Sequence, residues 1–121
     1  MYVLNQDAIK RLNRMLNLPA LGNEQDWEFE LADSDRIEEF LDLIKFAALT
    51  VEEKVALLAL ILSSAEDATN KDQNIDKYLG DLVSIISKDK NIFSEVLDYW
   101  ASVGSNESVF RKQISKIIRG C

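Results

Sequence analysis

The sequence predicts an all-α fold, a single compact bundle of about six helices over residues 1–121. Apolar residues recur at the 3.6-residue spacing of an α-helix in every long segment of the chain. Residue types typical of helix starts and stops flank these segments. A hydrophobic content of 47% is enough for an ordinary core at this length, and four glycines and one proline exclude collagen-like or low-complexity chains.

The first two predicted helices have recognisable ends. The first covers 5–16 and stops before Pro19, whose ring disfavours helical backbone in the residue ahead of it. The second begins at 33–35, where Asp35 and Glu38 have the spacing of a capping box. Its inward stripe is expected to consist of Ile37, Phe40, Leu41, Ile44 and Ala48.

The third predicted helix is the most apolar segment. Thr50 and Glu53 form a second capping-box pattern, which opens a helix over 51–65. Residues 55–62 are apolar on all sides of that helix, which is typical of a buried helix. We therefore expect it to be central, followed by a polar connection over 66–74.

Three further helices complete the predicted bundle. The fourth ends at the polar residues 88–90. Asn91 is expected to cap the fifth, Gly104 to end it in the left-handed conformation, and Ser105 or Asn106 to cap the sixth. Their inward residues are Ile75, Leu79, Leu82, Val83 and Ile86 in the fourth, Ile92, Phe93, Val96, Leu97 and Trp100 in the fifth, and Phe110, Ile114, Ile117 and Ile118 in the sixth.

Residues 26–31 break the helical period. Apolar and acidic residues alternate strictly there, as they do in a strand, but no second segment alternates in the same way to pair with it. We therefore expect an extended acidic connector over 24–32, pinned to the helices by its two aromatic residues. A short hairpin with residues 18–21 is the alternative.

Negative charge is concentrated in one stretch of the chain. The whole molecule carries a net charge of -7, whereas residues 23–42 alone hold nine carboxylates against one arginine, a charge of -8. Such a stretch can dock a basic partner, because complementary charge raises the association rate and adds specificity. The candidate partner-binding residues are Glu24, Asp26, Glu28, Glu30, Asp35, Glu38, Glu39 and Asp42.

The last four of these carboxylates follow the spacing i, i+3, i+4, i+7, opposite the apolar stripe of the second helix. A solvated acidic face without function is the alternative interpretation, because a helix dipole favours carboxylates in its first turn. The dipole does not account for the four carboxylates that precede the helix. We therefore favour a docking surface for a cationic partner.

The sequence lacks the residues that several classes of chemistry require. The sequence has no histidine, which removes the Ser-His and Cys-His nucleophile pairs and most zinc sites. The single cysteine, Cys121, excludes an internal disulfide and a Cys-x-x-Cys site. A calcium loop starting at Asp33 fails, because Glu38 and Ile44 stand where that loop needs glycine and glutamate. We expect no enzyme activity, no cofactor and no metal.

Nucleic-acid binding is the alternative function. The turn 102–105 could join the fifth and sixth helices of a helix-turn-helix, with Asn106, Ser108, Arg111, Lys112 and Lys116 on the recognition helix. The net charge of -7 opposes approach to phosphate, so no nucleic-acid partner is expected. The N-terminus lacks a signal-peptide pattern, and the longest apolar run, 55–62, is too short to cross a bilayer. We expect a cytoplasmic protein without a membrane partner.

Three stretches resemble a known class of proteins. They are 26–33 (DWEFELAD), 36–41 (RIEEFL) and 49–67 (LTVEEKVALLALILSSAED). Residues 18–68 as a whole resemble small bacterial immunity proteins associated with toxin delivery, including those of contact-dependent growth inhibition. The resemblance implies a cytoplasmic inhibitor that binds the toxic domain of a cognate effector, commonly a nuclease, and covers its basic active-site surface.

Overall fold

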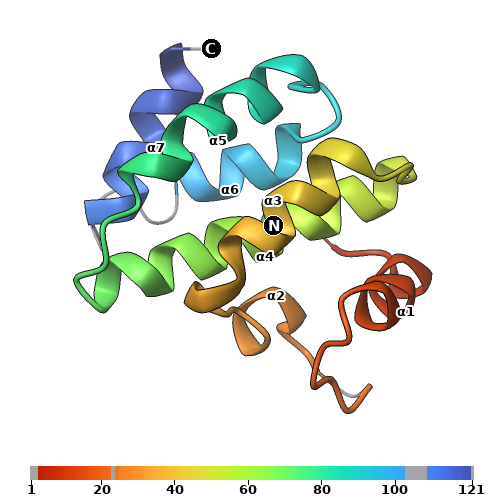
Figure 1. Cartoon of the computed structure of the whole chain (residues 1–121). Helices are drawn as coiled ribbons and strands as arrows, with labels where there is room; N and C mark the ends of the chain where they lie inside the picture. Colours follow the sequence, from red (N-terminus) through yellow and green to blue (C-terminus); the bar gives the residue numbers. More distant parts are fainter. Residues whose placement is uncertain (1–2, 23, 103–108, 121) are drawn as a thin grey trace.

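The computed structural model describes residues 3–22, 24–102 and 109–120, and within them it is all-α, as the sequence predicts (Figure 1). The described residues form seven α-helices and one short 3₁₀ helix, η1, with no strand. In chain order the elements are α1 (Gln6–Met15), α2 (Trp27–Glu30), η1 (Ser34–Arg36), α3 (Ile37–Phe46), α4 (Val51–Asn70), α5 (Asp76–Lys88), α6 (Ser94–Ser102) and α7 (Val109–Gly120).

Helix α4 is the centre of the molecule. It contacts α1, α2, α3, η1 and α7. In Figure 1, α1 and α2 lie on one side of α4, and α5, α6 and α7 lie on the other. Every residue from 56 to 65 is buried, and Leu58 and Ile61 are 0% exposed. The predicted central position of this helix is confirmed.

The predicted capping box at the start of α4 is confirmed as well. The Thr50 hydroxyl accepts a hydrogen bond from the Glu53 N–H at 3.1 Å, and the Glu53 carboxylate accepts one from the Thr50 N–H at 2.8 Å. The Arg11 guanidinium of α1 donates to both oxygens of the same carboxylate at 2.7 Å. One buried glutamate therefore fixes the first turn of α4 and joins it to α1.

Helix α4 is five residues longer than predicted and continues to Asn70. Ala68 is 1% exposed and keeps the last turn packed on the core. The Thr69 hydroxyl donates to the carbonyl of Ala65 at 3.1 Å, and Lys71 pairs with Asp67. The polar connection expected over 66–74 is therefore shorter, because polar residues on the exposed side of a helix do not terminate that helix.

The expected extended connector over 24–32 is wrong, since α2 is a turn of α-helix there. Two residues four apart share one side of a helix, so Trp27 and Leu31 are buried at 2% and 9% exposure, while Phe29 between them is 37% exposed. The Trp27 Nε1–H donates to the side chain of Asn13 on α1 at 2.8 Å. Tertiary contacts therefore select helix, and the described residues contain no hairpin with 18–21 either.

The capping box expected at Asp35 and Glu38 does not form. Instead, the Asp33 carboxylate accepts the N–H of Asp35 at 2.9 Å and caps η1, after which α3 begins. The hydroxyl of Ser64 on α4 accepts the N–H of Asp33 at 3.0 Å and is itself 0% exposed. The entry to α3 is thus fixed by the central helix.

Three further sequence expectations need correction, and a fourth is not tested. Helix α3 ends at Phe46, so Ala48 lies outside it and is exposed. On α5, Val83 is exposed and Ile85 takes the inward position. Helix α6 begins at Ser94, so Asn91 is not its cap. The expected stop at Gly104 and the caps Ser105 and Asn106 lie outside the described residues.

Helices α6 and α7 form the far end of the core. The rings of Trp100 and Phe110 pack edge to face with their centroids 5.9 Å apart, and Phe29 of α2 stacks on Trp100. The hydroxyl of Ser115 on α7 donates to the Ala101 carbonyl on α6 at 3.1 Å. Within the described ranges, no helix combines the length and the apolar character that crossing a membrane requires.

Candidate partner-binding surface

The structure divides the eight candidate carboxylates between the segment around α2 and the outer side of η1 and α3. The first group is Glu24, Asp26, Glu28 and Glu30. The second group is Asp35, Glu38, Glu39 and Asp42.

Two of the four carboxylates of the first group, Glu24 and Glu30, hold the local fold. The Glu24 carboxylate accepts two backbone N–H groups of the preceding loop, at 2.7 and 3.2 Å, and these hydrogen bonds lower its pKa. The Glu30 carboxylate accepts the N–H of Asp26 at the start of α2, at 2.9 Å. Glu28 is buried at 8% exposure. Asp26 is therefore the exposed member whose carboxylate has no partner among the residues that the structure describes.

The second group forms a ridge that we call the acidic crest: Asp35, Glu38, Glu39 and Asp42. All four are exposed. Glu39 pairs with Arg36 at 2.6 Å, and the hydrogen bond from that guanidinium lowers the pKa of the Glu39 carboxyl. Within the described part of the chain, the carboxylates of Asp35 and Asp42 have no ion-pair partner.

Arg36 holds the crest against α1. Its guanidinium donates to the carbonyl of Leu16 at the end of α1 and lies 5.5 Å from the ring centroid of Phe40. Arg36 is also the one arginine within the acidic stretch 23–42. Its charge is therefore used inside the fold, by Glu39 and by a backbone carbonyl.

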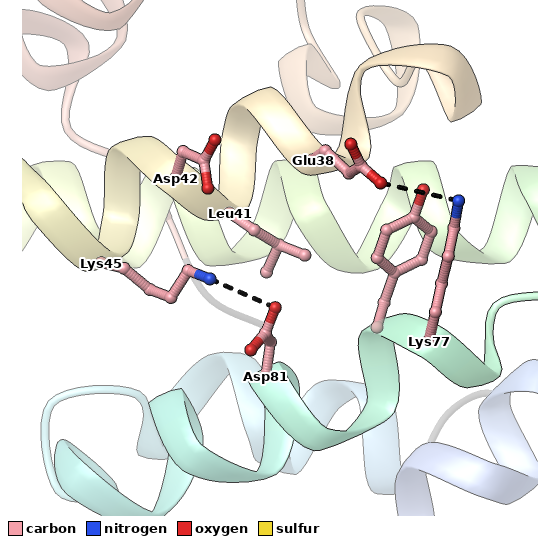
Figure 2. A pocket seen from close by; sticks show the side chains of 7 residues that line it. Glu38, Leu41, Asp42, Lys45, Lys77 and Asp81 are labelled. Carbon is pink, nitrogen blue, oxygen red and sulfur yellow. Dashed lines mark hydrogen bonds and ion pairs between the residues drawn. The ribbon is translucent and has the colours of Figure 1, made fainter.

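A pocket of about 220 Å³ lies between α3 and α5 (Figure 2). Two ion pairs span it, from Lys45 to Asp81 at 3.2 Å and from Glu38 to Lys77 at 3.6 Å. The side chains of Glu38 and Lys77 are 72% and 63% exposed, and so open a pair contributes little to the stability of the fold because water screens it. A lysine or arginine side chain of a partner could therefore replace Lys77 as the ion-pair partner of Glu38.

A second hollow lies on the other side of α3, against the end of α1. We call it the Phe46 groove, and it is lined by Met15, Leu16, Glu39, Asp42, Leu43, Phe46 and Ala47. Phe46 is 79% exposed, and the Lys45 ammonium lies 5.5 Å from its ring centroid. Asp42 lines both this groove and the α3–α5 pocket, so it lies between the two hollows.

Phe46 is a candidate that the sequence analysis missed. The signal was present, because a large aromatic residue two positions after Ile44 falls outside the inward stripe of the helix.

The residues of the nucleic-acid alternative are described only in part. The turn 103–105 with Asn106 and Ser108 lies outside the described residues, and so do the side chains of Arg111 and Lys112. Lys116 is exposed on α7. Among the described residues, no group of three or more acidic or cysteine side chains could hold a metal ion.

No protein-family model matches the chain, and no match emerges among curated proteins or solved structures. The candidate surface is therefore defined by the contacts among α1, α3 and α5 alone.

Proposed function

We propose that this protein is an immunity protein that binds a cognate cationic toxin domain and neutralises it. The observation that supports the proposal is the acidic crest, on which Asp35 and Asp42 are exposed carboxylates without an ion-pair partner among the described residues. Lysine or arginine side chains of a partner would supply the missing counter-charges. Such pairs gain strength when the interface excludes water, because the effective dielectric constant falls.

The shape of the crest favours a protein partner. Asp42 faces a hollow on either side of α3, so a partner that straddles the ridge can place basic side chains in both. Glu38 contributes to one hollow and Glu39 to the other. Two open hollows that share Asp42 suit a complementary protein surface better than they suit a small molecule, which is usually enclosed in one cleft.

A nuclease domain is the toxin class that this chemistry fits best. Active sites that act on nucleic acids collect lysine and arginine to hold phosphate. A row of carboxylates can occupy those cations and exclude the substrate. The resemblance of residues 18–68 to immunity proteins of contact-dependent growth inhibition points to the same activity, carried out in the cytoplasm.

The test begins with the coding sequence beside the gene for this chain. The proposal expects a large secreted protein with a basic C-terminal domain, and that purified domain, the neighbour domain, is the probe. An operon of metabolic enzymes at that position would contradict the proposal, and so would a neighbour domain that neither binds this protein nor is inhibited by it.

Two variants with equal charge then locate the binding surface. The first, Asp35→Asn with Asp42→Asn, removes the two unpaired charges of the crest. The control, Asp72→Asn with Glu95→Gln, removes two exposed charges elsewhere. We expect the crest variant to bind the neighbour domain about tenfold more weakly, mainly through slower association, because two of the charges that steer the basic partner are gone. Equal affinity of the two variants would exclude the crest as the docking site.

A further inference from the structure

The Phe46 groove combines exposed apolar side chains with acidic residues. Phe46 is 79% exposed, and Met15 across the groove is 39% exposed. Leu43 and Ala47 are partly exposed beside them. Single exposed apolar residues are ordinary, but a group that contains an exposed aromatic ring, placed beside unpaired charge, is typical of protein interfaces.

The rim of the groove carries the charge that selects its occupant. Glu39 and Asp42 lie along the α3 side, and Glu39 is paired with Arg36. Lys45 also approaches the groove, since its ammonium lies 5.5 Å from the ring centroid of Phe46, but the charge of that ammonium is paired with Asp81 of α5 at 3.2 Å (Figure 2). The rim therefore retains the uncompensated negative charge of Asp42.

We infer that the Phe46 groove is the binding hot spot for the cationic partner, and that it receives an apolar side chain flanked by lysine or arginine. The apolar side chain packs on Phe46 and Met15, while a flanking cation reaches Asp42. The binding energy of protein interfaces is concentrated in such buried aromatic contacts, which a polar rim surrounds. This inference rests on the proposed function, and adds the chemistry of the segment that the partner inserts.

Other occupants fit the charge of the rim less well. A second copy of this chain, packed about a two-fold axis, would bring the same carboxylates toward each other. A nucleic acid could stack a base on Phe46, but Glu39 and Asp42 would repel its phosphates. A basic segment is the occupant for which the apolar floor and the acidic rim are both favourable.

The groove and the crest should govern different rate constants. Exposed charges act mainly on the association rate, through their long-range field. A packed aromatic contact forms only after docking and therefore acts mainly on the dissociation rate. Kinetics can separate the two contributions even where both lower the affinity.

The experiment measures the binding kinetics of the full chain with the neighbour domain for three variants. Phe46→Ser and Met15→Ser alter opposite walls of the groove, and Leu21→Ser removes an apolar side chain that is 87% exposed elsewhere. We expect Phe46→Ser to raise the dissociation rate at least about tenfold, with Met15→Ser changing it in the same direction and Leu21→Ser leaving it unchanged. The unfolding temperature of the Phe46→Ser variant should lie within a few degrees of that of the parent, since the Phe46 side chain is exposed.

Each other outcome overturns the inference in a distinct way. If the parent binds and Phe46→Ser dissociates as slowly as the parent, the groove is not the hot spot, while the proposed function still holds. If the parent does not bind the neighbour domain, the proposed function and this inference fail together. If the free parent is a dimer that Phe46→Ser converts to a monomer in sedimentation, a second copy occupies the groove and the basic segment does not.

Discussion

Glu53 shows at the scale of one residue how a short sequence pattern becomes a tertiary contact. Its spacing from Thr50 predicts the capping box, because both hydrogen bonds lie within one turn. The ion pair with Arg11, 42 positions away, could not be predicted. The same limit applies to the candidate site: Asp42 was predicted as an exposed carboxylate, but the backbone partners of Glu24 and the hollow that Phe46 shares with Met15 of α1 depend on the folded chain.

The stability contribution of Glu53 should depend on pH. Burial raises the pKa of this carboxyl, but the hydrogen bond from the Thr50 N–H and the interaction with Arg11 outweigh that effect, so its pKa lies below the ordinary value of 4.5. Its contribution is therefore present above that value and is lost as the pH falls through the lower folded-state pKa.

Glu53→Gln is expected to lower the free energy of unfolding by about 1–2 kcal/mol near neutral pH, because the amide loses the charge-assisted bonds to Arg11. Urea titrations at about pH 7 and about pH 3 measure this, and the difference from the parent should shrink in acid. The control is Glu52→Gln, one position earlier on the exposed side of α4. A difference that grows in acid would contradict the assigned pKa direction.

At the scale of elements, the helices that could be predicted are those whose burial repeats over several turns. Helix α4 offers such a repeat, so its central position follows from residues 55–62 alone. Helix α2 is a single turn, in which alternation and helical spacing bury nearly the same residues. Its conformation is decided by the contact of Trp27 with Asn13 and of Phe29 with Trp100, which lie outside any local pattern.

Truncation inside α4 should be severe at its centre and mild at its exposed start. Leu58→Ala and Ile61→Ala are each expected to cost about 2–5 kcal/mol of unfolding free energy, because both side chains are fully buried and each change leaves a cavity. Val51→Ala is the control on the same helix, since that side chain is 51% exposed. Chemical denaturation measures all three, and a Leu58→Ala protein as stable as Val51→Ala would remove α4 from the centre of the core.

At the scale of the molecule, charge is distributed unevenly along the chain. The acidic residues of 23–42 contribute -8, whereas residues 105–121 carry four basic side chains against Glu107. A basic partner is attracted by the acidic segment 23–42 and repelled by the basic residues of 105–121. The field acts over distances of about 8 Å at physiological ionic strength and over longer distances in dilute salt.

The association rate with the neighbour domain should therefore fall steeply as salt is added, while the dissociation rate changes little. Stopped-flow mixing at several ionic strengths measures the slope, which should flatten in the Asp35→Asn, Asp42→Asn variant because two of the steering charges are gone. The comparison variant changes Arg111, Lys112 and Lys116 to glutamine on the basic helix α7. If that triple variant abolishes protection of toxin-expressing cells while the crest variant stays folded and fully protective, the partner binds at the basic end of the chain and the acidic docking surface is refuted.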